Sequence, residues 1–216
     1  TPYFGRRSKL LGPDTESRVS VDPTRIIPTP FSANLDTVEA SGVGTLYGGP
    51  NTTLGSSDSA EPRIYYASDL NLRNSEQITI DGPTYLVVSG DINLSGDSSI
   101  FVRENASLEI HVDGNVNLNG RGIVNQSQLP ANLAIIGTNS DTRSITFRGD
   151  DALFGAVYAP NSNFYAYGNN TTRNIYGAIV ARQVTFDDQT NFHFDVSLRE
   201  ASFGGVEKAY AFDPEE

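Results

Sequence analysis

Apolar and polar residues alternate over short runs along most of this chain. In Ile78-Thr79-Ile80, Leu108-Glu109-Ile110-His111-Val112 and Val116-Asn117-Leu118, every second residue is apolar. On a β-strand, a period of two places one set of side chains in the core and the other in solvent. Gly, Asn and Asp separate the runs, as they do at turns, and no helical spacing of apolar residues lies between them. The pattern predicts an all-β fold whose outer faces are wet.

The expected strands extend from about residue 64 to residue 198. Each combines aliphatic, β-branched or aromatic residues with turn-forming neighbours, and the later runs are the more aromatic. The predicted strands are Arg63 to Tyr66, Gln77 to Ile80, Thr84 to Val88, Asp91 to Leu94, Ser99 to Val102, Ser107 to Val112, Asn115 to Leu118, Asn132 to Ile136, Ser144 to Phe147, Leu153 to Tyr158, Tyr176 to Ala181, Val184 to Phe186 and Phe192 to Val196.

Two phrases recur at nearly equal periods. Val88-Ser89-Gly90-Asp91-Ile92-Asn93-Leu94-Ser95-Gly96 returns as Val112-Asp113-Gly114-Asn115-Val116-Asn117-Leu118-Asn119-Gly120. Gly155-Ala156-Val157-Tyr158-Ala159 returns as Gly177-Ala178-Ile179-Val180-Ala181, with Phe164 answered by Phe186. Self-similarity at such a period is typical of repeats that bury their apolar faces by stacking. We therefore predict a parallel β-solenoid (β-helix) with rungs of about 22–24 residues.

Residues 1–63 differ in character from the repeats. Seven of the eleven prolines lie in this segment, the last of them at Pro62, and the segment shows little periodicity, which predicts an extended Pro/Gly/Ser-rich arm. Three short apolar segments interrupt the arm: Val19-Ser20-Val21, Arg25-Ile26-Ile27 and Thr45-Leu46-Tyr47. Each is either an edge strand, added to a sheet in this chain or in another copy, or a loop packed locally on the core. The predicted organisation is an arm (1–63), a solenoid (64–198) and a C-terminal cap or tail (199–216), because an open solenoid end exposes unpaired strand edges.

Residues 64–198 also resemble a known repeat domain. The residues that carry the resemblance are Thr84 to Gly96, Leu108 to Leu118, Pro130 to Thr138, Gly155 to Asn161, Gly177 to Ala181 and Phe192 to Asp195. They are similar to the β-solenoid domain that follows pilin-like N-terminal segments in pilus-assembly (PilX-type) and related surface proteins of bacteria and archaea. The resemblance implies an extracellular, membrane-tethered or filament-associated role and supplies no catalytic residues. Asp195-Val196-Ser197-Leu198 departs from the family's more acidic closing phrase.

The composition limits the partners and the chemistry that we expect of this chain. The chain has 26 acidic and 15 basic residues, a net charge of −11, and no basic stripe, so we expect no nucleic-acid partner. It has no cysteine, which excludes disulfides and thiolate chemistry. It begins with Thr1 and contains no Met, which predicts that an upstream segment has been removed. No run approaches the roughly 18 apolar residues of a spanning helix, so we expect membrane attachment only through that missing segment.

Candidate catalytic groups are few. His111 and His193 are the only histidines; neither accompanies a Gly-x-Ser-x-Gly nucleophile motif, and we expect both to have structural roles, with His111 pointing outward. Paired carboxylates offer a polysaccharide hydrolase or lyase as a third hypothesis, although Asp at solenoid turns commonly bonds the backbone. The candidate pairs are Asp91 with Asp113, Asp150 with Asp151, and Asp187 with Asp188. A structural calcium ion is an alternative use of the turn oxygens, with no metal ligands assigned.

Two features suit a cell-surface protein that makes contact with glycans. Six Asn-x-Ser/Thr sequons are glycosylation candidates, of which Asn105 and Asn169 have the most loop-like settings; the others are Asn51, Asn93, Asn125 and Asn170. Tyr165 and Tyr167, with Tyr158 and Tyr176, form either a glycan-stacking strip or a ladder in the core.

These observations lead to one main hypothesis of function and two alternatives. The main hypothesis is a non-enzymatic extracellular structural protein, a subunit or accessory of a pilus-like filament or cell-surface layer. Its partners are further copies of the chain or other surface subunits. The N-terminal arm either covers the chain's own sheet or joins neighbouring subunits by strand donation. An adhesin or carbohydrate-binding solenoid is the second hypothesis, and the hydrolase or lyase is the third. No cofactor is expected beyond the calcium alternative.

Overall fold

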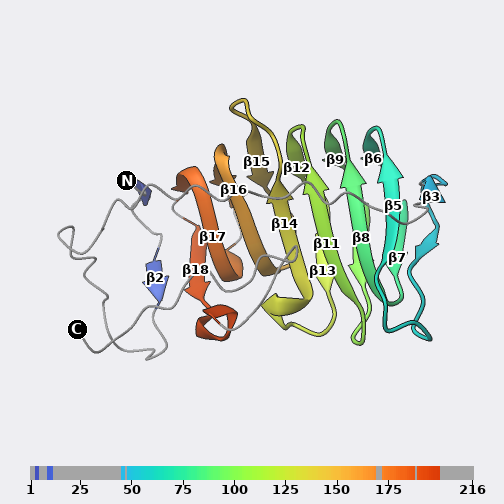
Figure 1. Ribbon diagram of the computed structural model, residues 1–216. Helices are drawn as coiled ribbons and strands as arrows, with labels where there is room; N and C mark the ends of the chain where they lie inside the picture. The colour runs from blue at the N-terminus through green and yellow to red at the C-terminus, as the bar shows by residue number, and fades with distance from the viewer. Residues whose placement is uncertain are drawn as a thin grey trace, which may run out of the picture.

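The computed structural model describes residues 3–4, 9–11, 45–46, 48–168, 172–187 and 189–199. Over these residues the chain forms parallel strands that coil through about six turns of a β-solenoid. Figure 1 shows the strands of successive turns side by side, with β3 (Thr45–Leu46) at one end of the stack and β2 (Lys9–Leu11) at the other. The predicted all-β, parallel β-solenoid is confirmed.

The described strands form three faces. The first face contains β3, β5 (Arg63–Ala67), β8 (Pro83–Val88), β11 (Ser107–Val112), β14 (Leu133–Gly137), the N-terminal halves of β16 (Leu153–Ala166) and β17 (Arg173–Phe186), β18 (Thr190–Phe194) and β2. The second face contains β6 (Leu70–Leu72), β9 (Ile92–Leu94), β12 (Val116–Leu118), β15 (Ser144–Phe147), the C-terminal halves of β16 and β17, and β1 (Tyr3–Phe4). The third face contains β4 (Thr53–Leu54), β7 (Gln77–Ile80), β10 (Ser99–Val102) and β13 (Gly122–Asn125).

Two short 3-10 helices complete the described elements. The first is η2 (Pro130–Asn132), which leads directly into β14, and the second is η3 (Val196–Arg199), which follows β18. Because β16 and β17 each continue from the first face to the second as single 14-residue strands, the later turns have one long strand where the earlier turns have two short ones.

The core is a set of ladders in which one apolar residue per turn stacks on the next. On the first face, one ladder runs through Leu86, Ile110, Ile135 and Val157, which are consecutive partners in the sheet register. Each of these side chains is at most 2% exposed. Burying a side chain of this size contributes about 1.5–3 kcal/mol. The apolar side chains that face inward therefore stabilise the stack along its length.

The repeated phrases mark the rungs as the sequence predicted. In the first phrase, Val88 pairs with Val112 and Ile92 pairs with Val116, each residue with its own repeat. In the second phrase, Gly155 pairs with Gly177. The expected match of Phe164 with Phe186 is wrong, because the register shifts between Ala159 and Asn163, so that Phe164 pairs with Val184. The irregularity at the corner shortens this part of the period by two residues.

Several strands and one boundary lie where the sequence did not predict them. The strands β4, β6 and β13 were not expected, since each has only two to four residues and belongs to neither recurring phrase. The strands β1 and β2 were not expected either. Thr45–Leu46 forms a strand of this chain's own sheet, pairing with Tyr65 and Tyr66. The stack therefore begins before residue 64. Val19 to Val21 and Arg25 to Ile27, most of the arm, and residues 200–216 lie outside the described residues.

The two ends of the stack are completed by strands from the N-terminal region. β2 pairs in parallel with β18, with Leu10 opposite Phe192, and β1 pairs with β17, with Phe4 opposite Phe186. β3 adds the first strand at the opposite end. Paired edges remove the exposed backbone donors and acceptors that would otherwise recruit other chains.

Part of the outward side of the first face, on β11, β14 and β16, is buried rather than wet, contrary to the sequence prediction. Five side chains there are only 3–9% exposed, although they alternate with core residues: Glu109, His111, Ala134, Ile136 and Ala156. The signal was present in Leu133-Ala134-Ile135-Ile136, a continuous apolar run typical of a strand buried on both sides. The second face keeps a polar outward side.

Candidate functional site

One column of polar and aromatic side chains runs along the outward side of the second face. We call this the polar column. Its members occupy the central outward position of successive turns and are partners in the sheet register. They are Asn71, Asn93, Asn117, Thr146, Tyr165 and Thr185. This solvent-facing column is one of two features on the surface of the described residues that have the chemistry to bind a ligand. The other is a hollow, described below.

The first three members form an amide ladder. The Asn93 Nδ2 donates to Asn71 Oδ1 at 3.1 Å, and the Asn117 Nδ2 donates to Asn93 Oδ1 at 2.8 Å. The spacing of neighbouring parallel strands, about 4.8 Å, suits such chains of side-chain amides. Both polar groups of the Asn93 side chain are therefore occupied. Asn71 and Asn117 were not among the residues that the sequence singled out.

A second ladder fixes the corner between the first and second faces. Asp69 Oδ1 accepts the backbone N–H of Asp91 at 2.9 Å, and Asp91 Oδ1 accepts the backbone N–H of Asn115 at 2.7 Å. Because Ile92 is the register partner of Val116, Asp91 aligns with Asn115. Asp113 lies two residues before Asn115, directly after β11, and is exposed. Asp91 thus bonds the backbone of the next turn, which was the alternative to a catalytic role for this residue.

The other candidate acids are also engaged in contacts that support the fold. Asp150 pairs with the buried Arg173 at 3.1 Å, and Asp151 pairs with Arg121 at 2.9 Å. Asp187 accepts the backbone N–H groups of Gly168 and Gln189. Asp188 lies outside the described residues. Of the described acids named for the hydrolase hypothesis, Asp91, Asp150, Asp151 and Asp187 thus bond groups of the fold, while the Asp113 side chain is exposed.

The four tyrosines of the predicted strip lie on two different faces. Tyr165 and Tyr167 are on the second face, where their rings are nearly parallel, 7° apart, with centroids separated by 6.0 Å. The Arg148 guanidinium lies 5.0 Å from the centroid of the Tyr167 ring, within the range of a cation–π contact. All three side chains are half-buried or exposed and face away from the core. Tyr158 and Tyr176 are outward on the first face.

Tyr176 belongs to a stack of rings on three successive strands. Its ring lies 4.6 Å from Phe154 and 4.3 Å from His193, at interplanar angles of 5° and 14°. These residues are register partners on β16, β17 and β18. Stacked rings add stabilisation beyond the area that they bury. The stack therefore helps to hold the last rungs together.

We expect His193 to make this end of the stack sensitive to acid. Burial lowers the pKa of His193 below its usual value of 6.5, so the unfolded chain binds a proton at a higher pH than the folded chain. Stability is full above pH 6.5 and is lost as the pH falls toward the folded pKa. Thermal melts of the wild type and of His193→Phe between pH 7.5 and 5 should diverge, with the melting temperature of the wild type falling further. Parallel melting curves would contradict this role.

His111 lies in a polar contact that the sequence did not predict. Its Nε2 is 2.6 Å from Glu109 Oε1, and both side chains are nearly buried. Burial and the Glu109 carboxylate raise the pKa of Tyr85, which is the sheet partner of Glu109. The signal was the spacing of two, which places Glu109 and His111 on the same side of β11.

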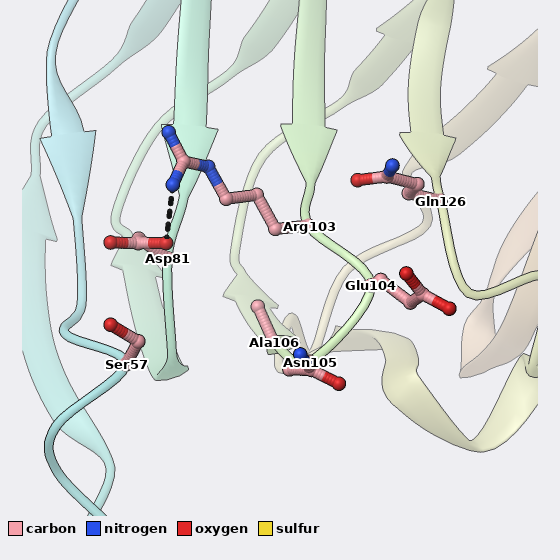
Figure 2. A pocket seen from close by; sticks show the side chains of 7 residues that line it. All are labelled: Ser57, Asp81, Arg103, Glu104, Asn105, Ala106 and Gln126. Atoms are coloured by element: carbon pink, nitrogen blue, oxygen red, sulfur yellow. Dashed lines mark hydrogen bonds and ion pairs between the residues drawn. The ribbon is translucent and has the colours of Figure 1, made fainter.

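A shallow hollow lies at the corner between the third and first faces (Figure 2). It has a volume of about 320 Å³ and is open to solvent. Figure 2 shows the Arg103 side chain reaching across to Asp81, to which it is bonded at 2.9 Å. Residues of polar type, which contribute both polar and apolar atoms, make up most of its lining and come from four successive turns: Ser57, Asp81, Arg103, Glu104, Asn105, Ala106 and Gln126. Asn105 of the predicted sequons stands at its rim.

The sequons occupy different environments. Asn51 and Asn105 are exposed, Asn93 belongs to the amide ladder, and Asn125 is 3% exposed. Asn169 and Asn170 lie outside the described residues. The structure thus places Asn105 in an exposed turn, in agreement with the loop-like setting predicted for it.

The described residues contain neither a cluster of metal-binding side chains nor a membrane-spanning helix. No group of three or more His, Asp or Glu side chains there could hold a metal ion, and the calcium alternative stays a prediction. In the same part of the chain, no helix has the length and apolar character needed to cross a bilayer.

Comparison with known proteins gives one match. A family model described as a domain of unknown function (DUF7305) matches residues 28–201. No curated protein and no solved structure matches the chain. The matched range begins inside the predicted arm, in agreement with a stack that starts before residue 64.

Proposed function

We propose that this chain, which belongs to the DUF7305 family, is a non-enzymatic structural protein of the cell exterior: a rigid shaft in a pilus-like filament or surface layer. Two features support the proposal: the sequence of residues 64–198 resembles the repeat domains of PilX-type surface proteins, and a stack of parallel rungs is a stiff spacer. The chain's partners in this role are further copies of itself, joined through β1 and β2.

The observation that carries the proposal is how the C-terminal end of the stack is completed. The strands that follow β17 and β18 in the sheets come from the first eleven residues of the chain, not from residues after β18. Such strands supply backbone hydrogen bonds to an edge that is otherwise open. The same hydrogen bonds form equally well when β1 and β2 come from a neighbouring copy.

The length of the connection permits both arrangements. From β2 to β3 the first face has nine strands, hence eight steps of about 4.8 Å or a span of roughly 38 Å. The segment between Leu11 and Thr45, roughly 33 residues, could extend to about 110 Å. The connection is therefore long enough to place β1 and β2 on the chain's own last rungs or on those of a neighbour. Repeated head-to-tail donation would generate an open filament.

Competition with a free strand tests the proposal. We expect the intact chain to form filaments or regular oligomers by electron microscopy and mass photometry, and an excess of a peptide of residues 1–11 to reduce them to single copies. A peptide with the same composition in scrambled order is the control. Assembly that is unchanged by the peptide, or a chain that stays monomeric at high concentration, would show that the joining mechanism is wrong.

Carbohydrate binding is the second candidate function. The observation in its favour is the pair of parallel Tyr165 and Tyr167 rings, with Arg148 beside them, at one end of the polar column. Aromatic faces next to amide and hydroxyl groups suit the alternating apolar and polar surfaces of sugars. This candidate predicts a monomer that retains glycans, which separates it from the filament.

A further inference from the structure

We propose that Asn105 carries an N-linked glycan whose first sugar lies against the corner hollow. This inference rests on the proposed function in one respect, since the modification requires export. In all other respects it is argued from the surroundings of each sequon Asn, namely whether its side-chain amide is exposed and available. N-linked transfer uses the side-chain amide nitrogen of a sequon Asn, and a bulky saccharide needs an exposed position.

Asn105 meets both conditions. It lies at the tip of the turn between β10 and β11 and is exposed. The next residue, Ala106, is only 3% exposed, and its backbone N–H donates to the Arg103 carbonyl at 3.0 Å. The buried Ala106 anchors the turn, so Asn105 is presented outward (Figure 2). Its side-chain amide makes no hydrogen bond with any residue that the structure describes.

The other described sequons are less suited. Asn93 uses its nitrogen to hold Asn71. Asn125 is buried, and its nitrogen donates to the carbonyls of Leu129 and Phe154 at 2.9 and 3.1 Å. A glycan replaces one of the two hydrogens on the amide nitrogen. At Asn125, where both hydrogens are used, it would remove one of these bonds and would need space inside the fold. At Asn93, the one remaining hydrogen would have to keep the bond to Asn71 beside the attached sugar. Asn51 is exposed, but its Oδ1 is fixed by the backbone N–H of Gln77 at 3.0 Å.

The hollow beside Asn105 offers a surface for the attached sugar. Arg103 is held by Asp81, while Glu104 and Gln126 complete a polar rim. Such groups hydrogen-bond sugar hydroxyls, and the Ala106 methyl and the Arg103 methylenes offer apolar surface. We therefore expect the first sugar to be ordered and to shield this corner.

Transfer of the saccharide to Asn105 needs an activated sugar donor. A membrane transferase would move a saccharide from a lipid-linked pyrophosphate donor to Asn105 Nδ2. A bond forms between Nδ2 and the anomeric carbon, the bond from that carbon to the pyrophosphate oxygen breaks, and Nδ2 loses one proton. No oxidant or reductant takes part.

Secretion from N-glycosylating cells tests the site. The full chain would be expressed behind a secretion signal, with a reporter sequon appended at its C-terminus, and occupancy at each Asn would be measured by peptide mass spectrometry. We expect occupancy at Asn105 to exceed that at Asn93 at least tenfold. Ser107→Ala, which removes the sequon but keeps Asn105, should abolish it. The matched control Ser95→Ala, which removes the Asn93 sequon, should leave it unchanged.

The same preparation separates this inference from the proposed function. An unmodified Asn105 in chains whose reporter sequon is glycosylated would overturn the inference, even if those chains form filaments. A glycosylated Asn105 in chains that remain monomeric would support the inference while contradicting the filament.

Discussion

Replacing Gly177 with Ala is expected to destabilise the folded chain by about 4 kcal/mol. Gly177 has a φ of +147°, a conformation that L residues with a Cβ rarely adopt. A Cβ built at this position would also overlap the carbonyl oxygen of Gly155, its partner on the preceding rung. Strain and overpacking therefore act together where β16 pairs with β17 on the first face. Urea unfolding followed by circular dichroism measures the loss.

Gly48→Ala is the matched control. A Cβ at Gly48 would have no atom within 4 Å, so we expect a change of at most about 0.5 kcal/mol. If Gly177→Ala were as stable as this control, the close approach of Gly155 and Gly177 would be wrong, and with it the register of β16 on β17.

Phe164→Ala is the second change with a large expected effect, about 3–5 kcal/mol. The Phe164 side chain is 0% exposed and packs edge-on against Phe186, with ring centroids 6.3 Å apart. Removing the ring leaves a cavity between rungs that cannot close, because the backbones on both sides are fixed by the sheet. The midpoint of urea unfolding should fall accordingly.

The neighbouring Tyr165→Ala provides the control, because Tyr165 faces outward and is half-buried. We expect it to cost about 1 kcal/mol or less. The same variant bears on carbohydrate binding: if that candidate holds, Tyr165→Ala loses glycan retention while it stays folded. Equal destabilisation by the two substitutions would assign Tyr165 to the core, as the ladder interpretation of these tyrosines had it.

The fold could be predicted because the repeats encode it locally. Strand alternation and the returning phrase from Val88 to Gly96 fix both the strand type and the length of a rung, and each rung contacts only its neighbours. The match of Phe164 with Phe186 failed because a corner irregularity changes the register without changing the pattern of residue types. The strands β1 and β2 could not be predicted, since their partners, β17 and β18, lie near the opposite end of the sequence.

The candidate site was predicted only in part. Asn105 could be selected as an exposed loop residue from its turn-forming neighbours. The tyrosine strip could not be resolved, because the corner within β16 sends Tyr158 and Tyr165 to different faces although both lie in one continuous strand. The amide ladder was missed because Asn71, Asn93 and Asn117 come together only once the register is known.

Mixing two cysteine variants tests the central claim most directly. Lys9 and Asn191 are register partners on β2 and β18, within the Cα separation that a disulfide needs, and the chain has no cysteine of its own. We predict that Lys9→Cys chains mixed with Asn191→Cys chains, once oxidised, give a disulfide between copies, whereas Lys9→Cys mixed with Arg63→Cys at the other end of the stack gives none. Unlinked chains in the first mixture would contradict strand donation between copies, and free thiols in the double variant Lys9→Cys/Asn191→Cys would contradict the pairing of β2 with β18 itself.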